Sequence, residues 1–245
     1  MNGSLSAMNL LASITPLILA GGLGTRLQAT IPGLPKVMVE VHGRPFLTYL
    51  LDQLHRSGFR SVLLCTGHRA GMISRGIGPV CRGLEIRYSR EEEPLGTGGA
   101  LRLALPQVQT EYLLVMNGDS FLHTDLTVYL AWHAGKSLAA SLLLTRVDEA
   151  GRFGRVEIGT DNRIASFREK EAIPGGGLIN SGIYLFRRDL LEKLPTQTNI
   201  SLEYDFFPEL VKCGCLHAFL VQASFIDIGT PESYAEAESF FASCP

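Results

Sequence analysis

A glycine-rich segment near the N-terminus carries the residue types that bind phosphate groups. Gly21, Gly22 and Gly24 follow a short apolar run, and Thr25 and Arg26 come directly after them. Glycines let the backbone approach phosphate oxygens closely, so that amide N–H groups can donate to those oxygens. The guanidinium of Arg26 adds charge-assisted donors that suit a polyphosphate. The segment therefore predicts a phosphate-binding loop.

Three other interpretations of this loop were weighed against a polyphosphate site. A dinucleotide-binding fingerprint needs a third glycine at position 27, where Leu27 stands. A Walker A loop needs Lys-Ser or Lys-Thr after the last glycine, where this chain has Thr25 and Arg26. The third interpretation is a glycine-rich turn that holds no ligand. The loop alone does not decide between a turn and a phosphate site.

Two aspartates come at the ends of apolar runs that are typical of buried strands. Asp119 follows residues 112–116, and Asp227 follows a short apolar run before the last helical pattern. Open α/β sheets place ligand-binding groups at the carboxyl ends of their strands. Carboxylate oxygens suit Mg²⁺, which often bridges to substrate phosphates. Taken alone, each aspartate is more simply interpreted as a turn or helix-cap residue.

The elements that would position these residues alternate in type along the first half of the chain. Strands are predicted at residues 17–20, 61–66, 84–88 and 112–116. Helices are predicted from Pro45 to a cap at Gly58, and at residues 68–77 and 99–105. This alternation predicts an α/β fold with a mainly parallel sheet that has helices on both faces.

The second half of the chain is richer in strand patterns than the first. Strands are predicted at residues 139–145, 155–158, 164–167 and 178–186, and helices at 203–211 and 231–241. No linker or internal repeat separates the halves. The sequence therefore predicts an N-terminal extension at residues 1–13 and a single domain at 14–245, with Met8 as an alternative start. The extension lacks the charged start and cleavage site of a signal peptide.

Composition excludes several classes of protein. The chain has 245 residues, of which 46% are hydrophobic and 19% charged, enough apolar mass for a full core. Its net charge of −2 argues against broad nucleic-acid binding, and no apolar stretch is long enough to span a membrane. Five irregularly spaced cysteines predict reduced thiols in a cytoplasmic protein and no structural zinc site.

The order of motifs along the chain resembles that of the sugar-1-phosphate nucleotidyltransferases. The glycine-rich loop is followed by Pro35-Lys36, and further motifs follow in the family's order at residues 93–100, 117–119, 169–170, 180–182 and 227–231. Together they cover residues 17–234. The resemblance implies a Rossmann-like (GT-A-like) nucleotidyltransferase fold, a mixed sheet with a strand-rich lobe that binds the sugar. One departure is Val37, where relatives usually have a second proline.

Within the family the chain most resembles the D-glycero-α-D-manno-heptose 1-phosphate guanylyltransferases, and mannose-1-phosphate guanylyltransferases share most of these features. The resemblance implies that GMP passes from GTP to a sugar 1-phosphate, giving a nucleotide sugar and pyrophosphate. The attacking phosphate oxygen is already an anion, so the reaction needs no general base. Two anions must nevertheless be aligned and neutralised. GTP and a sugar 1-phosphate are thus the expected partners, and a homodimer is one possible assembly.

The resemblance also implies a role for individual residues. Asp119 and Asp227 would share Mg²⁺, with Lys36 on the nucleotide phosphates, Lys170 on the sugar phosphate and Arg26 on the departing pyrophosphate. The residues that match the family's nucleotide site are Leu19, Ala20, Gly21, Gly22, Gly24, Thr25, Glu91, Gly96, Thr97, Gly98, Asn117 and Gly118. Those that match its sugar pocket are Gly154, Glu169, Lys170, Asn180 and Gly182.

Glu91 is the candidate for recognising guanine, whose Watson–Crick edge presents two adjacent N–H donors that a carboxylate can accept. The alternative is that residues 91–93 form a solvated acidic run. Gly96 and Gly98 are expected to let the backbone pass close to the base and ribose.

Two functions from other classes remain as alternatives. A nucleotide-binding regulatory subunit without catalysis is expected to have lost Arg26, Lys36, Asp119 or Asp227, and all four are present. A nicotinamide-dependent oxidoreductase needs an acidic ribose-binding residue after its second strand, where residues 65–68 read Cys-Thr-Gly-His.

Overall fold

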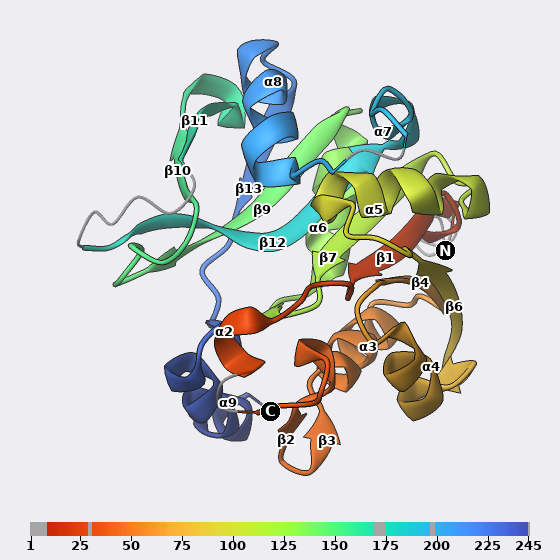
Figure 1. Ribbon diagram of the computed structural model, residues 1–245. Helices are drawn as coiled ribbons and strands as arrows, with labels where there is room; N and C mark the ends of the chain where they lie inside the picture. Colours follow the sequence, from red (N-terminus) through yellow and green to blue (C-terminus); the bar gives the residue numbers. More distant parts are fainter. Residues whose placement is uncertain (1–8, 29–30, 169–174, 197–198, 245) are drawn as a thin grey trace, which may run out of the picture.

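Parallel strands form the centre of a ten-stranded sheet in the computed structural model, which describes residues 9–28, 31–168, 175–196 and 199–244 (Figure 1). Strand β1 (Ile14–Leu19) lies between β4 (Ser61–Thr66) and β7 (Tyr112–Asn117), and β4 pairs with β6 (Leu84–Arg90). These four strands are all parallel. The predicted α/β fold with a mainly parallel mixed sheet is confirmed.

The order of these strands reverses at β1. The chain runs outward from β1 through β4 to β6, and then returns to place β7 on the other side of β1. The last residues of the two central strands, Leu19 and Asn117, are register partners. The glycine-rich loop and the loop carrying Asp119 therefore leave the sheet at the same edge. Open α/β sheets bind ligands at such a reversal of strand order.

The strand-rich second half extends the sheet beyond β7. Strand β12 (Gly177–Arg187) is antiparallel to both β7 and β9 (Ala140–Val147), and β13 (Leu216–Leu220) is parallel to β9. Strands β10 (Arg155–Ile158) and β11 (Ile164–Arg168) form an antiparallel extension on β12. At the other edge, β5 (Val80–Cys81) pairs with β6.

Helices cover both faces of the sheet (Figure 1). One face carries α3 (Leu47–Arg56), α4 (Ala70–Ile77), α6 (Leu126–Gly135) and α9 (Pro231–Ser243). The other carries α5 (Gly96–Ala104), α7 (Arg188–Glu192) and α8 (Phe207–Lys212). Neighbouring residues of β1 contribute to the cores on opposite faces of the sheet. Ile18 belongs to the same core as Leu50, whereas Leu17 belongs to the same core as Leu101. A central parallel strand is therefore apolar on both faces.

Short elements complete the fold around the reversal point. These are α2 (Thr25–Gln28), the 3-10 turns η1 (Lys36–Met38), η2 (Leu105–Gln107) and η3 (Thr160–Asn162), the π-helix η4 (Leu202–Phe206) and the hairpin of β2 (Glu40–Val41) with β3 (Arg44–Pro45). Strand β8 (Ser120–Leu122) pairs with β14 (Phe225–Asp227) in a small separate sheet, in which Asp227 lies opposite Ser120.

Local sequence signals account for most element boundaries but not for all elements. The helix predicted from Pro45 begins at Leu47, and its predicted cap is confirmed at Gly58, where φ is +98°. Helix α6 was not predicted, although Asp125 caps it and its buried residues recur with helical spacing. The single helix predicted at residues 203–211 is instead η4 followed by α8.

The end of the predicted N-terminal extension lies against the core. Residues 9–12 of the predicted extension are helical, and Leu10 and Leu11 pack against the core. Within the described ranges no helix is long and apolar enough to cross a membrane.

The prediction of free thiols is confirmed for Cys65, Cys81 and Cys244 but is wrong for the other two. The turn after α8 brings the Cα atoms of Cys213 and Cys215 within 5.4 Å, and the two form a disulfide.

The buried His133 predicts how stability depends on pH. Its Nδ1 lies 2.7 Å from Ser141 Oγ, and burial, the largest effect, lowers its pKa from 6.5 to about 4. As the pH falls from about 6.5 to 4, the unfolded chain binds a proton that the native protein does not. We expect this difference to lower the free energy of unfolding by about 3 kcal/mol over that range. Denaturant unfolding at several pH values, compared with His133→Asn, checks this; equal pH dependence in both proteins would contradict it.

Candidate functional site

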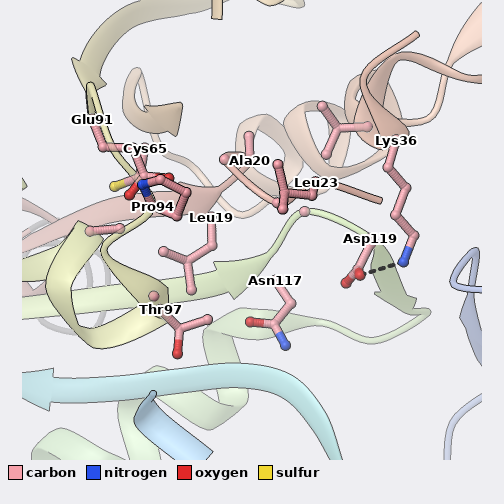
Figure 2. Close-up of a pocket in the computed structure, with 16 residues that line it drawn as sticks. Leu19, Ala20, Leu23, Lys36, Cys65, Glu91, Pro94, Thr97, Asn117 and Asp119 are labelled. Atoms are coloured by element: carbon pink, nitrogen blue, oxygen red, sulfur yellow. Dashed lines mark hydrogen bonds and ion pairs between the residues drawn. The ribbon is translucent and has the colours of Figure 1, made fainter. Parts of the chain in front are cut away.

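Two adjoining pockets lie at the edge of the sheet where β1 and β7 end. The glycine-loop pocket, shown in Figure 2, is lined by Leu19, Ala20, Gly21, Gly22, Leu23, Lys36, Val37, Cys65, Glu91, Pro94, Gly96, Thr97, Ala100, Asn117, Gly118 and Asp119. The aspartate pocket is lined by Gly24, Thr25, Arg26, Lys36, Thr97, Asn117, Asp119, Ser120, Arg152, Phe153, Gly154, Asn180, Gly182, Glu203, Tyr204, Phe225, Asp227 and Gly229. Four residues line both pockets: Lys36, Thr97, Asn117 and Asp119.

A close crossing of two loops forms the floor of the glycine-loop pocket. The N–H of Gly118 donates to the carbonyl oxygen of Leu19 at 2.9 Å. A Cβ atom at position 118 would lie 2.5 Å from that oxygen and 2.9 Å from Val37 Cγ1. A side chain there would push the loops apart, so the glycine holds Asp119 against the end of β1.

Glu91 lies at the end of this pocket opposite Lys36 and Asp119 (Figure 2). Its N–H donates to the carbonyl of Thr66 at 2.8 Å, and its Oε2 accepts from the N–H of Leu95 at 3.2 Å. Burial raises the pKa of Glu91, and the Leu95 N–H partly opposes this. Glu92 and Glu93 are exposed, whereas Glu91 is half-buried. The interpretation of residues 91–93 as a uniformly solvated run therefore fails at Glu91.

The two aspartates predicted to bind metal come together in the aspartate pocket. The N–H of Ile228 donates to the backbone carbonyl of Asp119 at 2.8 Å, which ties the end of β14 to the loop after β7. Asp119 Oδ2 lies 2.6 Å from Lys36 Nζ, and Asp227 Oδ1 lies 2.8 Å from a nitrogen of Arg152. Burial raises the pKa of Asp227, and the charge of Asp119 adds to this, while Arg152 and Lys36 oppose it.

This donor set fits a divalent cation. A buried carboxylate beside a second carboxylate is costly to ionise, and a cation between them would remove that cost. Mg²⁺ is usually held by one or two carboxylates together with waters and substrate phosphates. Across the described ranges, no three His, Cys, Asp or Glu side chains gather in a group suited to a metal ion. Further ligands for a cation at Asp119 and Asp227 would therefore come from water or substrate.

A polar network connects the lining of the two pockets. The hydroxyl of Tyr184 accepts from the amides of Asn180 (2.9 Å) and Asn117 (3.3 Å), and donates to Glu203 Oε1 (3.4 Å). Glu203 Oε2 accepts from the hydroxyl of Thr97 at 3.0 Å. The Oδ1 atom of Asn117 is buried and has no hydrogen-bond partner within the part of the chain that the structure describes. It remains available to accept from a ligand.

The predicted site residues fall into these pockets with few exceptions. Nine of the twelve predicted nucleotide-site residues line the glycine-loop pocket, while Gly24 and Thr25 line the aspartate pocket beside Arg26. The predicted sugar-site residues Gly154, Asn180 and Gly182 line the aspartate pocket. The remaining two, Glu169 and Lys170, lie outside the described residues.

The expectation for Gly98 needs correction, and the one for Thr97 needs refinement. Gly98 lines neither pocket; its N–H donates to the carbonyl of Ile200 at 2.8 Å, and a Cβ there would lie 2.9 Å from Ile200 Cγ2. The glycine at position 98 thus serves packing against the segment before η4. Thr97 lines both pockets, but its hydroxyl already bonds Glu203 and accepts the N–H of Leu202 at 2.7 Å.

Sequence reasoning missed four polar residues of the aspartate pocket: Ser120, Arg152, Glu203 and Tyr204. Arg152 stands two residues before the predicted sugar-site residue Gly154, and this proximity was a usable signal. Glu203 and Tyr204 fell inside a predicted helix, and no spacing pattern marked them. They reach the pocket because the segment before α8 packs against α5.

Comparisons with known proteins agree with this geometry. The sequence model of the family described as nucleotidyl transferase matches residues 15–243. A D-glycero-α-D-manno-heptose 1-phosphate guanylyltransferase from Aneurinibacillus thermoaerophilus is 35% identical, over 91% of this chain and 96% of that protein. A mannose-1-phosphate guanylyltransferase from Mycobacterium tuberculosis is 33% identical, over 92% of this chain and 64% of that protein. The crystal structure of HddC from Yersinia pseudotuberculosis complexed with GMP-PN matches with a TM-score of 0.82 and 34% identity, covering 93% of this chain and 99% of that one.

Proposed function

Because the chain belongs to the nucleotidyl transferase family, we propose that it transfers GMP from GTP to a sugar 1-phosphate and releases pyrophosphate. The observation that supports this proposal most is that Lys36 and Asp119 line both pockets, so that an ammonium and a carboxylate are available to two substrates bound side by side. The guanosine of GTP would occupy the glycine-loop pocket, and its phosphates would extend past Lys36 to Arg26 in the aspartate pocket. The sugar 1-phosphate would bind beside them in the aspartate pocket.

We take D-glycero-α-D-manno-heptose 1-phosphate as the sugar substrate. The relative named for that substrate matches this chain over nearly its whole length. A solved relative complexed with GMP-PN supports a guanine nucleotide. Mannose 1-phosphate is the second candidate, supported by the relative from Mycobacterium tuberculosis, of which this chain spans about two thirds.

The reaction on this proposal is an in-line displacement. An oxygen of the sugar phosphate attacks the α-phosphorus of GTP, the bond to the bridging oxygen breaks, and pyrophosphate leaves with its electron pair. Asp119 and Asp227 would hold Mg²⁺, which when bound neutralises charge on the phosphates. Lys36 lies at the junction of the pockets and holds the α-phosphate for attack, while Arg26 binds the departing pyrophosphate. Asn117 Oδ1 accepts a substrate hydroxyl.

Glu91 would select guanine by accepting from its two adjacent N–H groups. We expect Glu91→Gln to lower kcat/KM for GTP about 10- to 100-fold, the value of a charge-assisted hydrogen bond, and to leave the low activity with ATP unchanged. Steady-state pyrophosphate release with each nucleotide checks this. Glu92→Gln, which changes the exposed neighbour, is the matched control. An unchanged ratio of GTP to ATP use in Glu91→Gln would exclude Glu91 as the base-recognition residue.

The function itself is tested by pyrophosphate release from four nucleoside triphosphates paired with several sugar 1-phosphates, with Mg²⁺ and again with a chelator. We expect GTP with D-glycero-α-D-manno-heptose 1-phosphate to react fastest, and the chelator to abolish the reaction. A faster reaction with mannose 1-phosphate would select the second candidate. Nucleotide binding without turnover of any pair would favour the catalytically inactive regulatory subunit.

A further inference from the structure

Each of the two carboxylates that are proposed to hold the metal ion already has a positively charged side chain beside it. Lys36 neutralises Asp119, and Arg152 neutralises Asp227. The two cationic side chains differ in exposure, since that of Lys36 is 14% exposed and that of Arg152 is 49% exposed. Arg152 can therefore leave its carboxylate with little loss of packing.

The backbone next to Arg152 is held in place by contacts of the two residues that follow it. The ring of Phe153 packs edge-on against Phe225 with ring centroids 5.3 Å apart, and Phe225 begins the strand that ends at Asp227. The carbonyl of the next residue, Gly154, accepts the N–H of Asn180 at 3.1 Å. These contacts fix the backbone beside Arg152 at the aspartate pocket. The exposed side chain of Arg152 itself can still turn toward a ligand.

The formal charges of the aspartate pocket show why an anion needs this arginine. Its described lining has three cationic side chains, Arg26, Lys36 and Arg152, against three carboxylates, Asp119, Asp227 and Glu203. The formal charges of these described side chains cancel, so without a metal ion these six groups offer a phosphate dianion little net attraction. A divalent cation at the two aspartates would leave the lining with an excess of positive charge. The guanidinium displaced from Asp227 would then be free to bind an anion.

We propose that Arg152 binds the phosphate of the sugar 1-phosphate and exchanges that partner for Asp227 when the pocket is empty. A guanidinium presents paired N–H donors that match phosphate oxygens. Arg152 comes from the same segment as Gly154, whose carbonyl accepts the N–H of Asn180, and both of those residues belong to the predicted sugar site. Arg26, in contrast, follows the glycine-rich loop. This assignment rests on the proposed function, and it adds a phosphate ligand that the sequence motifs did not indicate.

The exchange has a consequence that can be measured without turnover. Because Arg152 occupies Asp227 in the free protein, it competes with a cation for that carboxylate. Removing the guanidinium should therefore strengthen cation binding to the free protein, although the same change weakens use of the sugar 1-phosphate. If Arg152 had only a structural role, its removal would not both strengthen cation binding and weaken use of the sugar 1-phosphate.

The test compares wild type with Arg152→Gln, Arg152→Lys and the control Arg146→Gln, which changes an exposed arginine of β9 outside both pockets. Pyrophosphate release gives KM for each substrate, and electron paramagnetic resonance of free Mn²⁺ gives the metal affinity without substrates. For Arg152→Gln we expect KM for the sugar 1-phosphate to rise about 10-fold or more, KM for GTP to change less than about 2-fold, and Mn²⁺ to bind about 2- to 5-fold more tightly. Arg152→Lys should fall between wild type and Arg152→Gln.

The outcomes separate this inference from the function on which it rests. An active wild type whose Arg152→Gln variant behaves like Arg146→Gln would overturn the role of Arg152 alone. A rise in KM for GTP in place of the sugar 1-phosphate would also overturn it, since the arginine would then bind the nucleotide. Weaker or unchanged Mn²⁺ binding would show that Arg152 does not compete for Asp227. A wild type that releases no pyrophosphate with any sugar 1-phosphate would reject the proposed function itself.

Discussion

Replacing Asp119 with asparagine is expected to lower kcat about 1,000-fold while leaving the fold intact. The variant keeps the size of the side chain but loses the charge that faces Lys36 and, on our account, the metal. Removing one preorganised charged group at a reacting phosphate typically costs a factor of 10² to 10³ in rate, and Asp119 serves both pockets. The measurement is pyrophosphate release at saturating GTP and sugar 1-phosphate.

Asp125 offers a control with the opposite pattern. Its carboxylate caps α6 by accepting the N–H of Thr127, and it lines neither of the two pockets. Asp125→Ala should cost about 1 kcal/mol of stability and leave kcat unchanged. If Asp119→Asn retained more than about a tenth of wild-type kcat, Asp119 would not be a metal ligand on the reaction path.

Replacing Lys36 with methionine should lower kcat/KM about 100-fold or more. The ammonium is largely buried, lies 2.6 Å from Asp119 and lines both pockets, so its loss removes positive charge from both substrates at once. Arginine should restore little of the activity, because the ammonium of Lys36 is a compact charge held 2.6 Å from Asp119 in a largely buried position, and a planar guanidinium does not reproduce that geometry.

The matched control for Lys36 is Lys212→Met, which removes an exposed ammonium paired with Glu209 at 2.6 Å on α8. Its kcat/KM should equal that of wild type, since exposed ion pairs contribute little. Measuring kcat/KM for GTP and for the sugar 1-phosphate in all three variants checks the prediction. Full activity of Lys36→Met with both substrates would place the reacting phosphates away from the junction of the pockets.

The central strands and the loops after them were predictable because their signals are local. The apolar run of β1 is followed by glycines, and β7 ends at Asn117, so the sequence marks where each strand ends and its loop begins. Alternation of strands and helices then places both loops at one edge of a parallel sheet. That is why most residues of the two pockets could be named without coordinates.

The parts that were not predictable depend on contacts between distant segments. Arg152 meets Asp227 across 75 positions, and Thr97 meets Glu203 across 106. Nothing in the sequence near Gly98 reveals that Ile200 packs on it, so a packing glycine looked like a ligand-binding one. The spacing of Cys213 and Cys215 predicts free thiols, because spacing alone does not show the turn that joins them.

The claim on which the account depends is that Asp119 and Asp227 share one divalent cation. A crystal of the protein with Mn²⁺ and a non-hydrolysable GTP analogue, measured for anomalous scattering, tests it directly. We expect one strong anomalous peak within about 2–2.5 Å of a carboxylate oxygen from each aspartate. A peak bound by neither aspartate, or by only one of them, would contradict it.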